Sequence, residues 1–336
     1  MCYPFCRKHG KHQTVKRREF ITLLGGAAAW PVVARGQFKP AIIGVLGSGS
    51  PQSSAFLIDA FKEGMNGNGL TEGRDYVLDV RWAEGDYTRF AALAFELLER
   101  KSSVIIVTTI AAARAAQQVA PATPLVMTGL IDPIGVGLIA SLARPGNNTT
   151  GISNMIQDMS AKGLELIREV APTATTIAAL FNPNNPGSHL ILEDVRSQAA
   201  KLGMTIQPIE FKGSAVLDTT LEAAARADAL LVVADSTLLD LGERIVGLAL
   251  RHRLPTFSSI PEFTDAGVLV GYGPSRRDSY RRAATYVKKV LEGAKPADIP
   301  VEQPTLIELS INMQTARALG IVIPGALLAR AERVIE

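Results

Sequence analysis

The chain has 336 residues, of which 47% are hydrophobic and 20% charged, so general disorder is excluded and about two domains are expected. The formal charge of the whole chain is +3 and that of residues 1–36 is +6, which leaves −3 for residues 37–336. A mildly acidic body argues against a nucleic-acid partner. Both cysteines, Cys2 and Cys6, lie in the first segment, so the body offers neither a disulfide nor a thiol nucleophile.

The first segment has the pattern of an export signal. Arg17 and Arg18 precede an uncharged stretch over residues 20–34, and the small residue Gly36 follows. A basic region, a short apolar region and small residues at the cleavage point are typical of a secretory signal. The paired arginines favour the twin-arginine route over the general secretory route. We therefore expect residues 1–36 to be removed near Gly36 and the mature protein to be periplasmic.

Short apolar runs alternate with helical periodicity through the first half of the body. Unbroken runs of β-branched residues between helices indicate parallel strands that are covered on both faces. A Gly- and Ser-rich turn over residues 47–51 separates the first strand from the first helix. Strands are predicted over residues 41–46, 76–83, 104–108 and 125–128, and helices from about residue 53, over 87–100 and over about 111–119.

The second half repeats this order of elements without visible sequence identity. The turn chemistry of residues 146–151 predicts that the chain begins to cross between the halves there. Two doubly wound α/β lobes are therefore expected. Strands are predicted over residues 176–181, 205–211, 230–234, 256–258 and 268–270, and helices over 189–202, 216–226 and 238–252.

A helix predicted over residues 275–291 has two distinct faces. Tyr280, Ala284, Val287 and Leu291 recur at helical spacing and should face inward. We interpret the basic face as a solvated helix surface, and a partner surface is the alternative. The residues assigned to this outer face are Arg276, Arg277, Arg281, Lys288 and Lys289.

Motifs for catalysis, metal binding and cofactor binding are not found in the body. Its two histidines, His189 and His252, stand in no metal-binding pattern. The body contains no Gly-x-Ser-x-Gly elbow, no complete dinucleotide fingerprint and no Walker sequence. We therefore expect no cofactor, no metal and no enzymatic activity.

Polar groups recur instead at the carboxyl ends of the predicted strands, where open α/β sheets bind ligands. They supply hydroxyls, amides and carboxylates, but no nucleophile beside a base. Such a set suits binding a small polar ligand better than transforming it, although each residue alone could equally cap a helix. The series comprises residues 47–50, Thr108 and Thr109, Thr128 and Gly129 with Asp132, Asn182 with Asn185 and Ser188, residues 235–237, Ser258 and Ser259 with Glu262, and Tyr272.

From Lys16 to the C-terminus the chain resembles the ABC transporter substrate-binding proteins, in the subgroup that includes tryptophan- and tyrosine-type binding proteins. The matches are long and follow the family's order. They are RREFITLLGGAAAWP at 17–31, RWAEG at 81–85, DPIG at 132–135, LARPGNNTTG at 142–151, FNP at 181–183, LEGAKPADIPVEQP at 291–304, IN at 311–312, TARALG at 315–320, IP at 323–324 and LLARA at 327–331.

The resemblance implies a type I periplasmic binding protein, with two Rossmann-like lobes joined by a hinge of about three crossings and a ligand in the cleft between them. It divides the body into a first lobe (38–150 plus 267–302) and a second lobe (151–266 plus 303–336). Members that take aromatic amino acids carry a threonine where this chain has Ala234, which argues against an aromatic amino acid as ligand. The positions that the resemblance implies in ligand contact are Ser48, Gly49, Thr128, Asp132, Ser153, Asn154, Asn182, Asp235 and Ser236.

The predicted function is therefore that of an exported, monomeric solute-binding protein of an ABC importer. It would capture an amino acid or a related organic acid by hinge closure and present it to a membrane permease. Three alternatives remain open: a binding protein that serves a membrane sensor, an exported α/β hydrolase-like enzyme, and a cytoplasmic sugar-type regulator. The regulator would need a DNA-binding helix pair at the N-terminus, where the export signal stands.

Overall fold

The structure, a computed structural model, describes residues 39–154 and 157–336. The export signal expected over residues 1–36, with its cleavage near Gly36, lies outside the described residues. Within the described part of the chain, no helix combines the length and the apolar character that crossing a membrane requires. Residues 40–336 form one unit that contains two β-sheets and the helices covering them.

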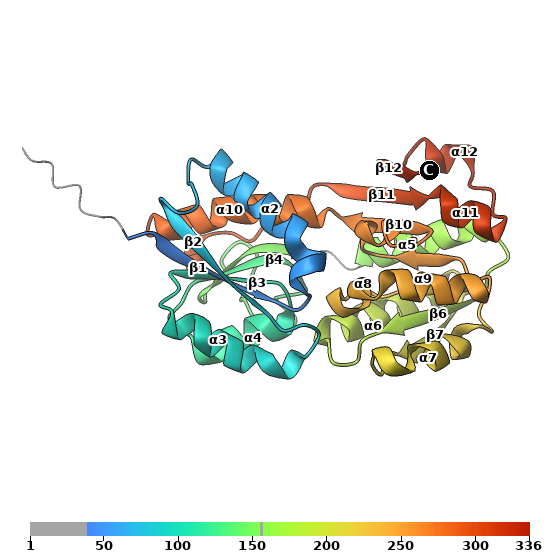
Figure 1. Cartoon of the computed structure of the whole chain (residues 1–336), viewed down its shortest axis with the longest axis horizontal. Coiled ribbons are helices and arrows are strands. Elements are labelled where there is room, and N and C mark those ends of the chain that lie inside the picture. Colours follow the sequence, from blue (N-terminus) through green and yellow to red (C-terminus); the bar gives the residue numbers. More distant parts are fainter. Residues whose placement is uncertain (1–38, 155–156) are drawn as a thin grey trace, which may run out of the picture. The chain divides into compact units, whose positions relative to one another are not determined.

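The first sheet has five parallel strands in the order β2-β1-β3-β4-β5 (Figure 1). This is a doubly wound order, in which the chain starts inside the sheet and later passes its own first strand. The strand β3 is a run of four buried aliphatic residues, as expected of a strand covered on both faces. The strands are β1 (Ala41–Gly47), β2 (Tyr76–Trp82), β3 (Val104–Val107), β4 (Leu125–Ile131) and β5 (Thr149–Asn154).

Two pairs of helices cover the two faces of this sheet (Figure 1). One face carries α2 (Pro51–Gly67) and α10 (Arg276–Leu291), and the other carries α3 (Phe90–Glu99), preceded by η1 (Tyr87–Arg89), and α4 (Ile110–Val119). The helices α2 and α10 pack closely at Gly64, where an added Cβ would lie 2.2 Å from the carbonyl oxygen of Arg281. A glycine is therefore required at this contact.

The second sheet has seven strands in the order β12-β11-β10-β9-β8-β6-β7. Its portion β7-β6-β8-β9-β10 is parallel and repeats the order of the first sheet strand for strand. The next strand, β11, pairs antiparallel with β10 and parallel with β12. The strands are β6 (Thr176–Phe181), β7 (Thr205–Glu210), β8 (Ala229–Val232), β9 (Thr256–Ser258), β10 (Val270–Pro274), β11 (Ile307–Asn312) and β12 (Arg333–Ile335).

Helices cover this sheet as well. The helices α5 and α6 pack with one set of strand residues, and α7 and α9 pack with the other set. The predicted class, two α/β lobes with parallel sheets, is confirmed. The remaining elements are α5 (Gln157–Val170), α6 (Pro186–Lys201), η2 (Ser214–Val216), α7 (Leu217–Ala224), α8 (Ser236–Asp240), α9 (Gly242–Arg251), η3 (Pro261–Thr264), η4 (Pro296–Asp298), α11 (Met313–Leu319) and α12 (Gly325–Leu328).

The chain crosses between the two sheets three times: after Asn154, after Pro274, and between Glu302 and Ile307. Strand membership shifts the first two crossings from the positions expected at 150/151 and 266/267. The reason is that β5 completes the first sheet, and β10 the second, before the chain leaves each of them.

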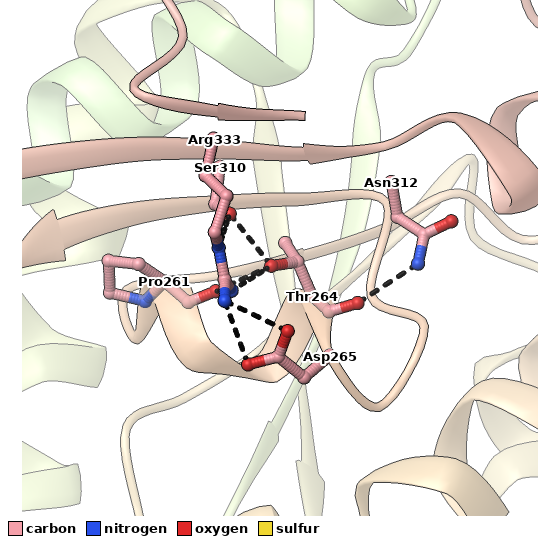
Figure 2. A network of polar contacts seen from close by, with 6 residues as sticks. All are labelled: Pro261, Thr264, Asp265, Ser310, Asn312 and Arg333. Carbon is pink, nitrogen blue, oxygen red and sulfur yellow. Dashed lines mark hydrogen bonds and ion pairs between the residues drawn. The ribbon is translucent and has the colours of Figure 1, made fainter. Parts of the chain in front are cut away.

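A polar network, in which Thr264, Ser310 and Asn312 are buried, attaches the C-terminal strands to η3 (Figure 2). The Thr264 hydroxyl donates to the Pro261 carbonyl at 2.8 Å, shares a hydrogen bond with Ser310 and accepts one from Arg333. Arg333 also pairs with Asp265 at 2.9 Å. We call Thr264, Asp265, Ser310, Asn312 and Arg333, with the carbonyl of Pro261, the C-terminal polar network. The Asn312 amide belongs to it because it donates to the Thr264 carbonyl at 2.9 Å.

Candidate functional site

A cavity of about 180 Å³ lies between the two sheets, at the carboxyl ends of their strands. Ser48 and Thr108, which follow β1 and β3, line it from the first sheet. Asn185 and Asp235, which follow β6 and β8, line it from the second sheet. In each sheet the contributing strands flank the point where the strand order reverses, which is where doubly wound sheets bind their ligands.

The cavity wall is partly polar and partly apolar. Hydroxyl and amide groups come from the strand ends, and Trp82 contributes an aromatic surface next to Gly47. A mixture of this kind accommodates a small molecule that has both polar groups and an apolar body. The aliphatic and aromatic residues of the second lobe that line the cavity include Leu164, Leu166, Ile167, Ile191, Val195, Leu231, Val233, Ala234, Phe257, Ile260, Val270 and Tyr272.

Asp235 is 3% exposed, and its carboxylate accepts five hydrogen bonds. Its Oδ1 accepts from the Asn182 amide at 3.3 Å and from the backbone N–H groups of Thr237 and Leu238 at 2.9 and 3.2 Å. The two backbone contacts make Asp235 the N-cap of α8. Its Oδ2 accepts from the Tyr87 hydroxyl and from the Asn185 amide, both at 2.9 Å.

Asp235 and its neighbour Ser236 also connect the two lobes. Tyr87 belongs to the first lobe, and so does Ser48, whose hydroxyl donates to that of Ser236 at 3.0 Å. Burial, followed by the charge of Asp235, raises the pKa of Tyr87 far above its usual value, so the phenol remains a donor at physiological pH. Close approach requires Gly85, since an added Cβ there would lie 2.8 Å from Thr237. We call the Ser48–Ser236 and Tyr87–Asp235 pairs the interlobe clasp.

The strand β4 contains a bulge where it lines the cavity. Its register with β5 shifts between Thr128 and Leu130, and Gly129 adopts a φ of +93°. Bulges of this kind redirect side chains at binding sites. The Thr128 Oγ1 and the Asn154 Oδ1 are buried and have no hydrogen-bond partner within residues 39–154 and 157–336. Both residues line the cavity, so both atoms can bond to a ligand.

Arg276 corrects one interpretation made from the sequence. The basic face of α10 was expected to be solvated, but Arg276 lines the cavity and its Nη1 is buried. It is the first residue of α10, and the chain enters that helix directly from the carboxyl end of β10. One turn further along, Tyr280 lines the same cavity. Burial raises the pKa of Tyr280, and the nearby charge of Arg276 offsets part of this rise. The other basic residues of this face do not line the cavity.

The structure brings most of the sequence-predicted site residues together. Further members of the strand-end series also line the cavity, namely Thr109, Gly129, Asn185, Ser258, Ser259 and Tyr272. The predicted ligand-binding residues that line the cavity are Ser48, Gly49, Thr108, Thr128, Asn154, Asp235 and Ser236.

Four predicted residues lie outside the cavity wall. Asp132 is exposed in a turn, where its Oδ1 accepts from the Gly135 N–H at 2.9 Å. Ser153 is buried within β5, and its N–H donates to the Glu302 carbonyl. Asn182 is buried outside the cavity wall, and its side-chain amide donates a hydrogen bond to Asp235. Glu262 lies in η3, where burial raises the pKa of its carboxyl and its Oε2 has no partner among the described residues.

Two residues of the site were missed from the sequence. Arg276 would have been found by the strand-end rule if β10 had been extended to Pro274. Tyr87 follows β2 at a distance of several residues, and nothing in the sequence points to Asp235 as its partner. A search of the described residues found no group of His, Cys, Asp and Glu side chains that could hold a metal ion.

Comparisons with known proteins agree with this geometry. The family model of the ABC transporter substrate binding proteins matches residues 43–335. A tyrosine-binding protein of Clostridioides difficile is 24% identical over 260 residues, which cover 77% of this chain and 75% of that protein. The matched residues span both sheets and all three crossings.

Two similar crystal structures extend the comparison. A conserved domain protein from Vibrio cholerae superimposes with a TM-score of 0.83 at 26% identity, over 88% of this chain and 100% of that one. An ABC domain from Streptococcus pneumonia, solved in complex with L-Trp, has a TM-score of 0.82 and 26% identity over the same shares of the two chains. The two-lobed fold is thus that of a type I periplasmic binding protein, and the chain belongs to the ABC transporter substrate-binding protein family.

Proposed function

We propose that the protein is the exported solute-binding component of an ABC importer. It captures a small polar ligand, an amino acid or a related organic acid, in the cavity between its lobes and presents it to a membrane permease. The protein acts as a monomer, and the three crossings between its sheets serve as the hinge. No nucleic acid takes part.

The observation that carries this proposal is the shared cavity wall. Strand ends of both sheets supply polar groups to one cavity, so a ligand held there contacts both lobes at once. A ligand of that kind favours the closed arrangement by its greater affinity for it. The family membership and the L-Trp bound to the similar pneumococcal structure support the same role.

The interlobe clasp gives closure a structural basis. The Ser48–Ser236 and Tyr87–Asp235 hydrogen bonds both join the rims of the two lobes, beside the cavity. Separation of the lobes would break both bonds and expose Asp235 to water. The arrangement described here is therefore the closed form in this proposal, and the ligand adds its own contacts to those of the clasp.

Binding without chemistry is the simplest use of this cavity. Among the described residues, neither histidine nor cysteine lines it. Its one buried carboxylate, that of Asp235, already accepts five hydrogen bonds and is not placed as a general base. We therefore propose that the ligand leaves unchanged.

Small-angle scattering combined with calorimetry tests the capture function. The purified protein is titrated with the common amino acids and with simple carboxylic acids, and the radius of gyration is followed. At least one compound should bind with a stoichiometry of one and reduce the radius of gyration. If compounds bind but none of them compacts the protein, closure is contradicted.

Export is tested separately from capture. A double substitution, Arg17→Lys with Arg18→Lys, keeps the charge of the signal but removes the arginine pair. Export by the twin-arginine route should stop, whereas export by the general secretory route should continue. Fractionation of the periplasm distinguishes the two results, and a full-length protein retained in the cytoplasm without any substitution would contradict export altogether.

A further inference from the structure

We infer that Arg276 is the residue that receives the carboxylate of the captured acid or amino acid. This inference rests on the proposed capture function and assigns one end of its ligand to a named residue. Arg276 lines the cavity, and its Nη1 is buried without a hydrogen-bond partner within residues 39–154 and 157–336.

The other arginines at the start of α10 behave differently. Arg277 donates to Glu63 on α2 at 2.7 Å, and Arg282 pairs with Glu302. Arg281 lies within 3.7 Å of Glu63. All three are thus neutralised by carboxylates of the first lobe, whereas Arg276 forms no ion pair with any described residue.

The position of Arg276 is unfavourable for a cation in the absence of an anion. A buried donor on a charged group costs free energy when it has no acceptor. Arg276 is also the first residue of a 16-residue helix, where the helix dipole favours negative charge and disfavours positive charge. A bound carboxylate would remove both costs, and the planar guanidinium matches its two oxygens.

The carboxylates near Arg276 do not fulfil this role. The charge of Arg276 acts on Glu262 and Asp240, but neither residue forms an ion pair with it. Burial is the main influence on both carboxyls and raises the pKa of each. Asp235 is fully engaged by its five donors. The acceptor that Arg276 lacks must therefore come from outside the described residues.

Two further groups lie near the Arg276 guanidinium. The charge of Arg276 acts on the pKa of Tyr280, and α10 packs against β4, which carries Thr128. The Thr128 hydroxyl can donate to the second carboxylate oxygen, and the Asn154 Oδ1 can accept from an amino group if the ligand has one. The carboxylate is thus the required feature of the ligand, and the amino group is an optional one.

Calorimetric titration with matched compounds tests this inference. Two series share an apolar body and differ in the polar end: 3-phenylpropionate, 3-phenylpropionamide, 2-phenylethylamine and L-phenylalanine, and the corresponding leucine-shaped compounds. In at least one series the acid and the amino acid should bind about tenfold or more tightly than the amide and the amine, since a charge-assisted hydrogen bond contributes that much.

Variants assign the effect to the residue. Arg276→Gln should weaken binding of the acid about tenfold or more and leave the amide unaffected, and Arg276→Lys should recover part of the loss. Arg277→Gln, one position along the helix, is the matched control and should bind like the unmodified protein. Thermal unfolding of each variant verifies that it is folded.

The outcomes separate the two proposals. If the amide or the amine binds as tightly as the acid, or if Arg276→Gln binds the acid as well as the unmodified protein does, the inference is overturned while the capture function stands. If neither these compounds nor any compound of the wider titration binds to the unmodified protein, the capture function fails and the inference fails with it.

Discussion

The cavity between the lobes and the C-terminal polar network both contain buried polar groups, yet these groups are satisfied in different ways. In the network, Thr264, Ser310 and Arg333 bond to one another and to backbone carbonyls (Figure 2). In the cavity wall, Thr128 and Arg276 keep polar atoms without partners among the described residues. Since an unpaired buried polar group costs free energy, the network serves the fold and the cavity wall serves a ligand.

The locations of the C-terminal polar network and of the cavity wall agree with these separate roles. The network joins β11 and β12 to η3, and none of its residues lines the cavity. Its neighbour Ile260 belongs to the cavity wall, so the network also holds one part of that wall in place. Substitutions in the network should therefore act on stability, and substitutions in the cavity wall should act on binding.

Asp235 is the exception in the cavity wall because it is fully satisfied, and its replacement should have the largest effect. Asp235→Ala removes the N-cap of α8 and leaves five donors without their acceptor. The free energy of unfolding should fall by about 3 kcal/mol or more, measured by urea denaturation. Asp132→Ala, at an exposed carboxylate with one backbone contact, is the control and should cost less than about 1 kcal/mol. Similar losses for the two variants would contradict the assignment.

Thr264→Val should break the C-terminal polar network and leave the cavity intact. The substitution keeps the shape of the side chain but removes three hydrogen bonds, from Thr264 to Pro261, Ser310 and Arg333. We expect a loss of about 2 kcal/mol in the free energy of unfolding and unchanged ligand affinity. Thr205→Val, at an exposed strand position, is the matched control. An affinity loss that exceeds the stability loss would show that the two regions are not separate.

Tyr87→Phe should reduce ligand affinity while leaving stability nearly unchanged, which is the reverse of the effect expected of Thr264→Val. It removes the Tyr87–Asp235 hydrogen bond of the clasp, but Asp235 keeps four other donors. Ligand affinity should fall about tenfold by calorimetry, while the free energy of unfolding changes by less than about 1 kcal/mol. Because the pKa of Tyr87 is strongly raised, this contribution to affinity should be the same at pH 6 and pH 9. Unchanged affinity in the variant would show that the interlobe clasp does not contribute to ligand binding.

The smallest change in the free energy of unfolding is expected from a substitution of Glu262, which lies between the cavity wall and the C-terminal polar network. Burial raises the pKa of its carboxyl above the ordinary value of 4.5, so the folded protein retains a proton that the unfolded chain releases. The free energy of unfolding therefore falls as the pH rises from about 4.5 through the raised pKa. Glu262→Gln should remove this dependence and stabilise the protein at pH 7 but not at pH 4. Glu99→Gln, at an exposed position, is the control, and an equal effect of Glu262→Gln at both pH values would contradict the mechanism.

The order of elements was predictable from sequence because it depends on local patterns. The strand β9 was predicted with its observed bounds, and the repeated order of the two halves reappears in the two sheets. The strands β5, β11 and β12 were not predicted. The turn chemistry of residues 146–151 indicated a crossing between the lobes and not the start of β5. Strand-end positions such as Ser48 and Asp235 followed from the rule for doubly wound sheets.

The sequence did not predict which polar residues bond to other residues of the chain and which face the cavity with unpaired atoms. Asn182 and Thr128 were both predicted at strand ends, yet Asn182 bonds to Asp235, whereas the Thr128 Oγ1 is buried without a partner among the described residues. Arg276 and Arg277 are adjacent in sequence, and only one lines the cavity. Such differences depend on contacts between residues far apart in the chain, which a periodic pattern does not encode.

A crystal structure of the protein with a carboxylic acid selected by the titrations tests the central claim most directly. We predict electron density for one small molecule in the cavity between the sheets, with its carboxylate on Arg276 and with contacts to both lobes. Density for the acid on a single lobe outside this cavity, or density for a reaction product, would contradict the account.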